Sequence, residues 1–295
     1  MGDALDMIYA DLAAEVVAGL DAMTPLQREG IRRSLNAPNL TLPENAALWE
    51  VIAPATQDDD QTNDSPLADV RAALEDLPGD SWRALNNALF ILYRGNVFDE
   101  ACEYLEGGGI RFGFDALQGG RYKTFLDAVD AEAARIGRNI SILDVGCWQG
   151  TLMCELLQRG YAVGGTDICE EVGAVVQERI QRLRPEHRLH LGFRAGWAHE
   201  ALTHYQDGAF DVLTCQETLE HVPAAVLQAT CDEMVRVVQY SIIVEVPGWD
   251  DDWPPHLRVY TIADLEGLFI RNGWCMEVFQ EPGVGVYTLV KVVRE

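Results

Sequence analysis

Residues 140–167 read ISILDVGCWQGTLMCELLQRGYAVGGTD, and this stretch decides the fold. An apolar run that ends at Val145 breaks at Gly146, a helical pattern starts at Gly150, and a second apolar run ends on Asp167. The order predicts a strand, a tight turn, a helix and a second strand closed by an acid. In a doubly wound α/β sheet this arrangement opens a nucleoside site, because the turn and the helix N-terminus hold one end of a ligand and the acid accepts the ribose hydroxyls.

The spacing of the turn separates two classes of nucleoside ligand. A dinucleotide site needs G-x-G-x-x-G, because the second glycine lets backbone amides approach a pyrophosphate. The second position here is Trp148 and the third is Thr151. The turn therefore argues against a pyrophosphate and against an NAD-dependent oxidoreductase, and it favours a nucleoside ligand without a phosphate.

Residues 144–150 resemble the D-x-G-C-x-x-G motif of class I S-adenosylmethionine-dependent methyltransferases, with Trp148 in place of the usual middle glycine. The resemblance implies S-adenosyl-L-methionine as the cofactor. It also implies that Asp167 binds the ribose and that Ile168 lies on the adenine, while Asp167 could in addition cap the following helix. The residues predicted to hold the cofactor are Asp144, Gly146, Cys147, Gly150, Asp167, Ile168 and Gln216.

Strands and helices alternate after residue 120, as they do in α/β proteins. The periodicity predicts strands at 140–145, 162–167, 187–193, 210–215 and 241–246, then an antiparallel pair at 274–280 and 286–293. Helices are predicted at 121–136, 151–158, 171–183, 224–237 and 263–272. The resemblance implies a Rossmann-like, seven-stranded methyltransferase sheet with helices on both faces, in a domain covering residues 119–295.

Residues 1–118 have a different texture and are predicted to form an N-terminal, all-helical extension. Helical spacing covers 1–35, where Thr24-Pro25 marks a restart, then 42–52, 68–77, 81–93 and 96–105. Residues 53–66 are acidic and lack periodicity, which predicts a mobile loop. The extension suits a lid, a cap or a dimerisation surface, and the sequence does not choose among them.

The second informative segment is residues 215–223, CQETLEHVP, which follows the fourth predicted strand of the sheet. Ligands of such sheets lie beyond the carboxyl ends of the strands, so this segment should border the transferred methyl group. Glu217, Glu220 and His221 have i, i+3, i+4 spacing, which gathers their side chains if the turn is helical. Two carboxylates and an imidazole can hold a divalent ion.

The same segment resembles the E-x-x-E-H of ubiquinone-pathway O-methyltransferases and of small-RNA 3′-end 2′-O-methyltransferases. This resemblance implies a metal site, Mg or Mn, at Glu217, Glu220 and His221, with His256 as the fourth ligand. Many relatives share the L-E-H sequence without a metal, and there the histidine serves as a general base or braces the loop. All three interpretations stay open, and the predicted catalytic residues are His221 and Glu217.

The charge and composition bound the partners of the chain. Its 295 residues carry 47 acidic and 22 basic side chains, a formal net charge of −25. Phosphate backbones are bound through Lys and Arg, so a nucleic-acid partner is disfavoured.

The seven cysteines form no C-x-x-C pair, which favours reduced thiols. No run is long and apolar enough to span a bilayer, and the first 20 residues lack the basic start of a signal peptide. We expect a cytoplasmic protein that does not associate with membranes.

The hypothesis that best fits these motifs is methyl transfer from S-adenosyl-L-methionine to oxygen or nitrogen of a small-molecule acceptor. One alternative is a metal-dependent RNA-end 2′-O-methyltransferase, which the acidic charge opposes. Another is a catalytically silent relative that serves as an interaction subunit, and a homodimer is compatible with each.

Overall fold

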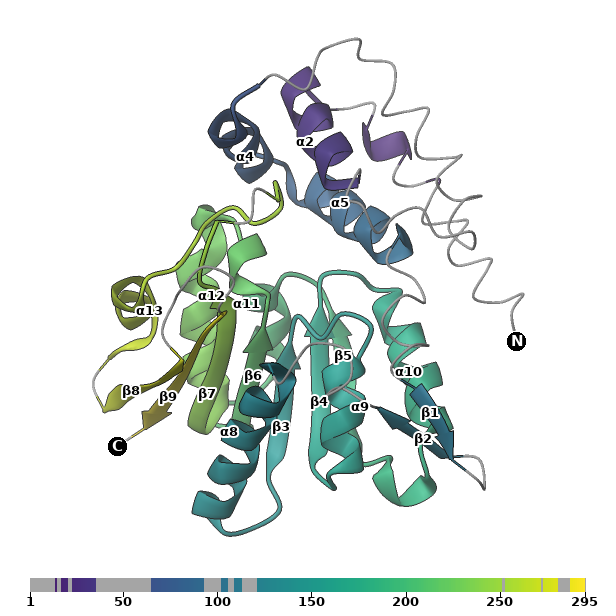
Figure 1. Ribbon diagram of the computed structural model, residues 1–295, viewed down its shortest axis with the longest axis vertical. Helices are drawn as coiled ribbons and strands as arrows, with labels where there is room; N and C mark the ends of the chain where they lie inside the picture. Colours follow the sequence, from purple (N-terminus) through teal and green to yellow (C-terminus); the bar gives the residue numbers. More distant parts are fainter. Residues whose placement is uncertain are drawn as a thin grey trace. The chain divides into compact units, whose positions relative to one another are not determined.

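The computed structural model describes residues 14, 17–20, 23–35, 65–92, 102–105, 109–112, 121–250, 253–271, 273–280 and 287–294 (Figure 1). The chain divides into two compact units. One comprises Met1–Asn96 with Asp250–Arg258, and the other comprises Val97–Trp249 with Val259–Glu295. The predicted helix at 42–52 and almost all of the predicted loop at 53–66 lie outside the described residues.

Three helices form the described part of the first unit, namely α2 (Pro25–Leu35), α4 (Leu67–Glu75) and α5 (Gly79–Leu92). Thr24 and Gln27 start α2 with reciprocal bonds between backbone and side chain, which satisfy free N–H groups of the first turn. Gly30 lets α2 approach α4 closely, because a Cβ there would lie 2.9 Å from Leu74. Arg71 of α4 pairs with both carboxylate oxygens of Asp250, which joins the segment Asp250–Arg258 to this unit.

A two-stranded hairpin opens the second unit and corrects one prediction. The helix predicted at 96–105 is wrong over Cys102–Leu105, because this segment is β1 and pairs antiparallel with β2 (Gly109–Phe112), while residues 96–101 lie outside the described residues. Leu105 and Gly109 form the last pair, so the glycine-rich stretch that was taken as the end of a helix connects two strands.

Seven strands form one mixed sheet, and the predicted α/β fold is confirmed. Their order is β5-β4-β3-β6-β7-β9-β8, in which β3 to β7 are parallel and β9 lies antiparallel between β7 and β8. The strands are β3 (Ser141–Val145), β4 (Ala162–Asp167), β5 (His190–Ala195), β6 (Phe210–Gln216), β7 (Val238–Pro247), β8 (Trp274–Gln280) and β9 (Tyr287–Arg294).

Helices cover both faces of this sheet, as predicted (Figure 1). Successive side chains of a strand point to opposite faces, and on β7 Ile242 and Val244 join a core with Met234 of α12 and Phe269 of α13. The opposite face carries Ser241, beside α8. The helices are α8 (Arg121–Ile136), α9 (Thr151–Gln158), α10 (Val172–Arg182), α11 (Ala198–Ala201), α12 (Ala224–Val237) and α13 (Ile262–Phe269).

The face toward α8 also holds a buried ion pair. Glu132 of α8 is fully buried and receives Lys291 of β9 at 3.3 Å and Arg135 at 2.5 Å. Burial raises the pKa of Glu132, but the bonds from Arg135 and Ser241 outweigh it and the pKa is lowered overall. This network fixes α8 on the sheet.

Among the described residues, no helix has both the length and the apolar character needed to cross a membrane.

Candidate functional site

The segments that carry the predicted site follow neighbouring parallel strands. The turn at residues 146–150 follows β3, Asp167 ends β4, and Gln216 ends β6. Because β4, β3 and β6 are adjacent and parallel, these three segments leave the sheet at one edge. The structure therefore brings together the cofactor residues predicted from the sequence.

The turn after β3 has an unusual backbone. Gly146, Trp148 and Gly150 all have positive φ, at 72°, 47° and 75°. The amides of Gly146 and Cys147 both donate to the Thr166 carbonyl on β4, at 2.8 and 3.0 Å. A Cβ on Gly146 would lie 2.5 Å from Cγ2 of Thr218. Glycine is therefore required at 146 both for its φ and for the close approach of the neighbouring loop.

Asp167 holds this turn through its side chain. Its carboxylate accepts the Trp148 amide at 2.9 Å and the Cys169 amide at 3.1 Å. Burial raises its pKa to about 6, although the backbone amides that donate to it lower the pKa in part. An ionised carboxylate offers about four acceptor sites, so the two amides leave capacity for ribose hydroxyls. The alternative role as a cap of α10 is not seen, since the residue that precedes α10 is Glu171.

Asp144 lies beneath the turn. It is 2% exposed, and its carboxylate accepts the Thr214 hydroxyl at 2.8 Å. Burial raises the pKa of Asp144 to about 7, and the neighbouring charge of Asp167 contributes to the rise. Two carboxylates are thus held in a desolvated place at the heads of β3 and β4, where a cationic ligand would stabilise their charged forms.

The remaining predicted cofactor residues differ in exposure. Ile168 is half-buried, so part of its side chain can receive an adenine. Cys147 is buried, and its Sγ lies where a Cβ on Gly165 would meet it at 3.0 Å. Burial raises the pKa of the Cys147 thiol well above its usual value, which leaves the thiol neutral. We therefore assign the side chain of Cys147 to packing.

The loop after β6 is fixed by its neighbours. Gln216 donates to the Glu245 carboxylate on β7 at 3.0 Å, and the Glu217 amide donates to the Glu245 carbonyl at 2.9 Å. The Thr218 hydroxyl lies 3.2 Å from the Val145 carbonyl and 3.1 Å from that of Gln216. This loop is therefore tied to both β7 and the end of β3.

Glu220 and His221 lie on a 3₁₀ turn, Leu219–His221. Glu220 is fully buried and His221 is half-buried. The Tyr260 hydroxyl donates to the Leu219 carbonyl at 2.8 Å and fixes this turn. The helical turn that would gather Glu217 with Glu220 and His221 is not formed from Glu217 onward, because Glu217 has a φ of 48° and lies outside the 3₁₀ turn. His256 belongs to the first unit, where its ring lies edge-on to Trp253 with centroids 4.8 Å apart.

Backbone strain coincides with this edge of the sheet. Within the described part of the chain, Trp148 and Glu217 are the two non-glycine residues with positive φ. Such conformations cost about 1–3 kcal/mol each and cluster at ligand sites. One lies in the loop after β3 and the other in the loop after β6, and these two strands are neighbours.

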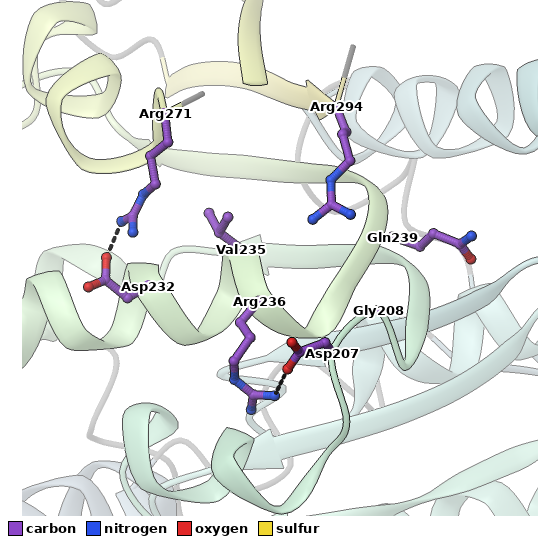
Figure 2. A pocket seen from close by; sticks show the side chains of 8 residues that line it. All are labelled: Asp207, Gly208, Asp232, Val235, Arg236, Gln239, Arg271 and Arg294. Carbon is purple, nitrogen blue, oxygen red and sulfur yellow. Dashed lines mark hydrogen bonds and ion pairs between the residues drawn. The ribbon is translucent and has the colours of Figure 1, made fainter. Parts of the chain in front are cut away.

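A cavity of about 570 Å³ lies at the opposite edge, near the amino ends of β6 and β7 (Figure 2). Arg236 donates to Asp207 at 2.8 Å there, and Arg271 pairs with Asp232. Arg294 stacks over the Trp274 ring, 4.8 Å from its centroid. The guanidinium groups of Arg236 and Arg271 already have carboxylate partners. This cavity lies at the other edge of the sheet from the site described above and differs from it in its charged groups.

Three contacts that shape the site were not found by sequence reasoning. Thr218 packs against Gly146, Tyr260 holds the turn that carries His221, and Arg179 of α10 donates to Gln149 in the turn after β3. Thr218 and Tyr260 carry no sequence signal for these contacts. Arg179 does carry one, because it is a charged residue in the apolar stripe of a helix.

Comparison with known proteins gives a family for the central part of this chain. Residues 142–240 match the model of a family described as "Methyltransferase domain". A ubiquinone biosynthesis O-methyltransferase of Pseudomonas paraeruginosa is 38% identical over 110 residues, which cover 37% of this chain and 44% of that protein. The corresponding protein of Burkholderia thailandensis is 34% identical over 115 residues, or 38% and 45% of the two chains. The chain thus spans less than half the length of these curated relatives.

A solved structure agrees with the fold. The magnesium protoporphyrin IX methyltransferase of Synechocystis PCC 6803, crystallised with bound SAM, superimposes with a TM-score of 0.51 at 18% identity. The match covers 70% of this chain and 95% of that one. At this identity the likeness concerns the fold alone.

Proposed function

We propose that this chain, which contains a class I S-adenosylmethionine-dependent methyltransferase domain, transfers a methyl group to oxygen or nitrogen of a small-molecule acceptor. The observation that carries the proposal is the geometry at the heads of β3 and β4. There the strained turn at 146–150 is held by Asp167, whose carboxylate keeps unused acceptor capacity. The match of residues 142–240 to the methyltransferase-domain family, and the 38% identity to an O-methyltransferase over 110 residues, support the same reaction class.

The residues present fit the cofactor. S-adenosyl-L-methionine supplies an electrophilic methyl group on a positively charged sulfonium, which departs as a neutral thioether. Asp167 would accept the ribose hydroxyls, and Ile168 would contact the adenine. The buried carboxylates Asp144 and Asp167 both have raised pKa values, so a nearby cation favours their ionisation and is stabilised in return.

His221 is the proposed general base. Bound S-adenosyl-L-methionine would supply the methyl group to the acceptor oxygen or nitrogen, with the carbon–sulfur bond exchanged for the new carbon–oxygen or carbon–nitrogen bond and its electron pair kept by sulfur. The acceptor proton passes to His221, which the 3₁₀ turn and Tyr260 hold in position. Such assistance contributes about 10²–10⁴ in rate. Glu217, in its strained conformation, lies beside the same region and is proposed to orient the acceptor.

The small-molecule acceptor is supported by charge. A chain with a formal net charge of −25 repels polyphosphate backbones at physiological salt. A large anionic nucleic acid is therefore a poor partner for this protein, and the RNA-end alternative loses its support.

The predicted Mg or Mn site is not used in this mechanism. Its predicted donors were Glu217, Glu220, His221 and His256, and Glu217, with a φ of 48°, lies outside the 3₁₀ turn that carries Glu220 and His221. Full activity in EDTA, together with unchanged turnover in Glu220→Ala, would agree with the metal-free base. Loss of activity in EDTA with restoration by Mg²⁺ or Mn²⁺ would establish the metal and replace the role given to His221.

The test of the proposal is a screen of small phenols, alcohols and amines that measures release of S-adenosylhomocysteine, with His221→Asn as the control variant. We expect release with at least one acceptor from the wild-type protein and release slower by about 10²–10⁴ from the variant. Absence of cofactor binding at millimolar concentration would refute the proposal and favour a silent interaction subunit.

A further inference from the structure

A charged side chain is buried in the apolar face of α10. The buried residues of this helix are Val172, Val175, Val176, Arg179 and Ile180, which recur at helical spacing on one face. Arg179 is 6% exposed. A guanidinium removed from water is costly unless its N–H groups find acceptors, so its partners show what it does there.

Those partners lie in the turn after β3. One Arg179 nitrogen donates to the Gln149 carbonyl at 2.5 Å, and the other terminal nitrogen donates to the Gln149 side-chain oxygen at 2.6 Å. A guanidinium presents its donors in a rigid plane, so two bonds to one residue fix both the main chain and the side chain of that residue. Gln149 is itself buried.

Gln149 is the residue between Trp148 and Gly150, both of which have positive φ. Asp167 accepts the Trp148 amide from the side of β4, and Arg179 donates to the next carbonyl from the side of α10. The Gly150 amide donates to the Cys147 carbonyl at 2.8 Å and closes the turn. A strained backbone persists only where its surroundings hold it, and these contacts hold this turn from two sides.

We propose that Arg179 is a positioning residue for the cofactor turn: it fixes the carbonyl and the side chain of Gln149 and so maintains the turn in which Trp148 and Gly150 both have positive φ. The proposal rests on the proposed function in that the turn binds the cofactor. It also explains how tryptophan is accommodated where a glycine would adopt a positive φ without strain. Arg179 acts through Gln149 and contacts no cofactor itself.

The first experiment compares two arginines that both donate hydrogen bonds to backbone carbonyls. Arg179→Met keeps the length of the side chain and removes its donors. Arg236, which Figure 2 shows beside Asp207, supplies the matched control Arg236→Met, because it also donates to two backbone carbonyls, those of Leu202 and Tyr205, each at 2.9 Å. Both variants should lower the urea midpoint. Arg179→Met alone should weaken binding of S-adenosyl-L-methionine, by at least about tenfold, which equals about 1.4 kcal/mol.

Two further variants separate positioning from general stability. Arg179→Lys, which retains one charged donor, should recover part of the affinity. Gln149→Leu, which removes the side-chain acceptor and keeps the carbonyl, should give an intermediate loss. An affinity of Arg179→Met within twofold of wild type, measured by calorimetry on folded protein, would overturn the proposal.

A readout without cofactor keeps this test independent of the proposed function. Hydrogen exchange at the amides of Trp148 and Gly150 should be faster in Arg179→Met than in wild type and unchanged in Arg236→Met. If the wild-type protein binds no cofactor but exchange follows this pattern, the proposed function fails and the positioning role stands. Equal exchange in all three proteins would refute the positioning role.

Discussion

Replacing Gly146 by alanine tests the geometry of the cofactor turn, because the loss in the free energy of unfolding can be compared with that of a matched glycine. The new Cβ faces two separate costs. Its φ of 72° lies in the left-handed region, where an L-residue loses about 1–2 kcal/mol. It also lies within 3.0 Å of three side-chain atoms of Thr218, and such overpacking costs about 1–3 kcal/mol. We expect a total loss of about 2–5 kcal/mol in the free energy of unfolding, as the sum of these two ranges.

Gly137 supplies the matched control. Its φ of 76° is nearly the same, and a Cβ there would meet no atom within 4 Å. Gly137→Ala should therefore lose about 1–2 kcal/mol from the backbone alone. The difference between the two variants isolates the contact between the loop after β3 and the loop after β6.

The assay is urea unfolding followed by circular dichroism, with the double variant Gly146→Ala/Thr218→Ala added. Truncating Thr218 removes Oγ1 and Cγ2 and leaves its Cβ 2.8 Å away, so the double variant should recover part of the loss. In a double-mutant cycle the two changes should therefore be less damaging together than their sum. Equal losses in Gly146→Ala and Gly137→Ala, or strict additivity in the cycle, would refute the reasoning.

Three other predictions concern titration and catalysis. Asp167 has a pKa of about 6, so the dissociation constant for S-adenosyl-L-methionine should rise about tenfold per pH unit below pH 6. Asp167→Asn should remove this pH dependence. A wild-type dissociation constant that stays the same from pH 5 to 8 would contradict the prediction. The pKa of Asp144 is raised from 3.8 to about 7 in the folded state. Protonated Asp144 therefore contributes on the order of 4 kcal/mol to the free energy of unfolding below about pH 4, and this contribution is lost as the pH rises to about 7. Denaturant unfolding at pH 5 and pH 8 should show a smaller fall in Asp144→Asn than in wild type, and an equal fall would count against the raised pKa. His221→Asn should lower kcat by about 10²–10⁴ with the cofactor dissociation constant unchanged, and an unaltered kcat would exclude the base role.

The strands and helices of the sheet unit follow from local patterns. The helices at 121–136, 151–158 and 224–237 and the strands at 162–167 and 274–280 were predicted with the bounds that the structure gives. Buried strands and amphipathic helices are recognised from the periodicity of their apolar residues, because one face of each must pack against the core. The strand at Cys102–Leu105 was predicted as helix because two strands of four residues are too short to show either period.

The site was predicted as a set of segments and less well as a set of contacts. Asp167 and the turn at 146–150 were found because the order of strand, turn and acid is local in sequence. The contacts of Thr218 with Gly146 and of Arg179 with Gln149 join residues 72 and 30 positions apart. The backbone of Glu217 depends on a bond to Glu245, and spacing within 217–221 contains no information about it.

The central claim is that the heads of β3 and β4 bind S-adenosyl-L-methionine through Asp167. Isothermal calorimetry of the cofactor with wild-type protein and with Asp167→Ala tests it most directly. We predict binding by the wild-type protein and a dissociation constant at least about tenfold higher in the variant, because hydrogen bonds to a charged acceptor contribute about 1.5–3 kcal/mol each. No binding by the wild-type protein at millimolar cofactor, or an equal dissociation constant in Asp167→Ala, would contradict the account.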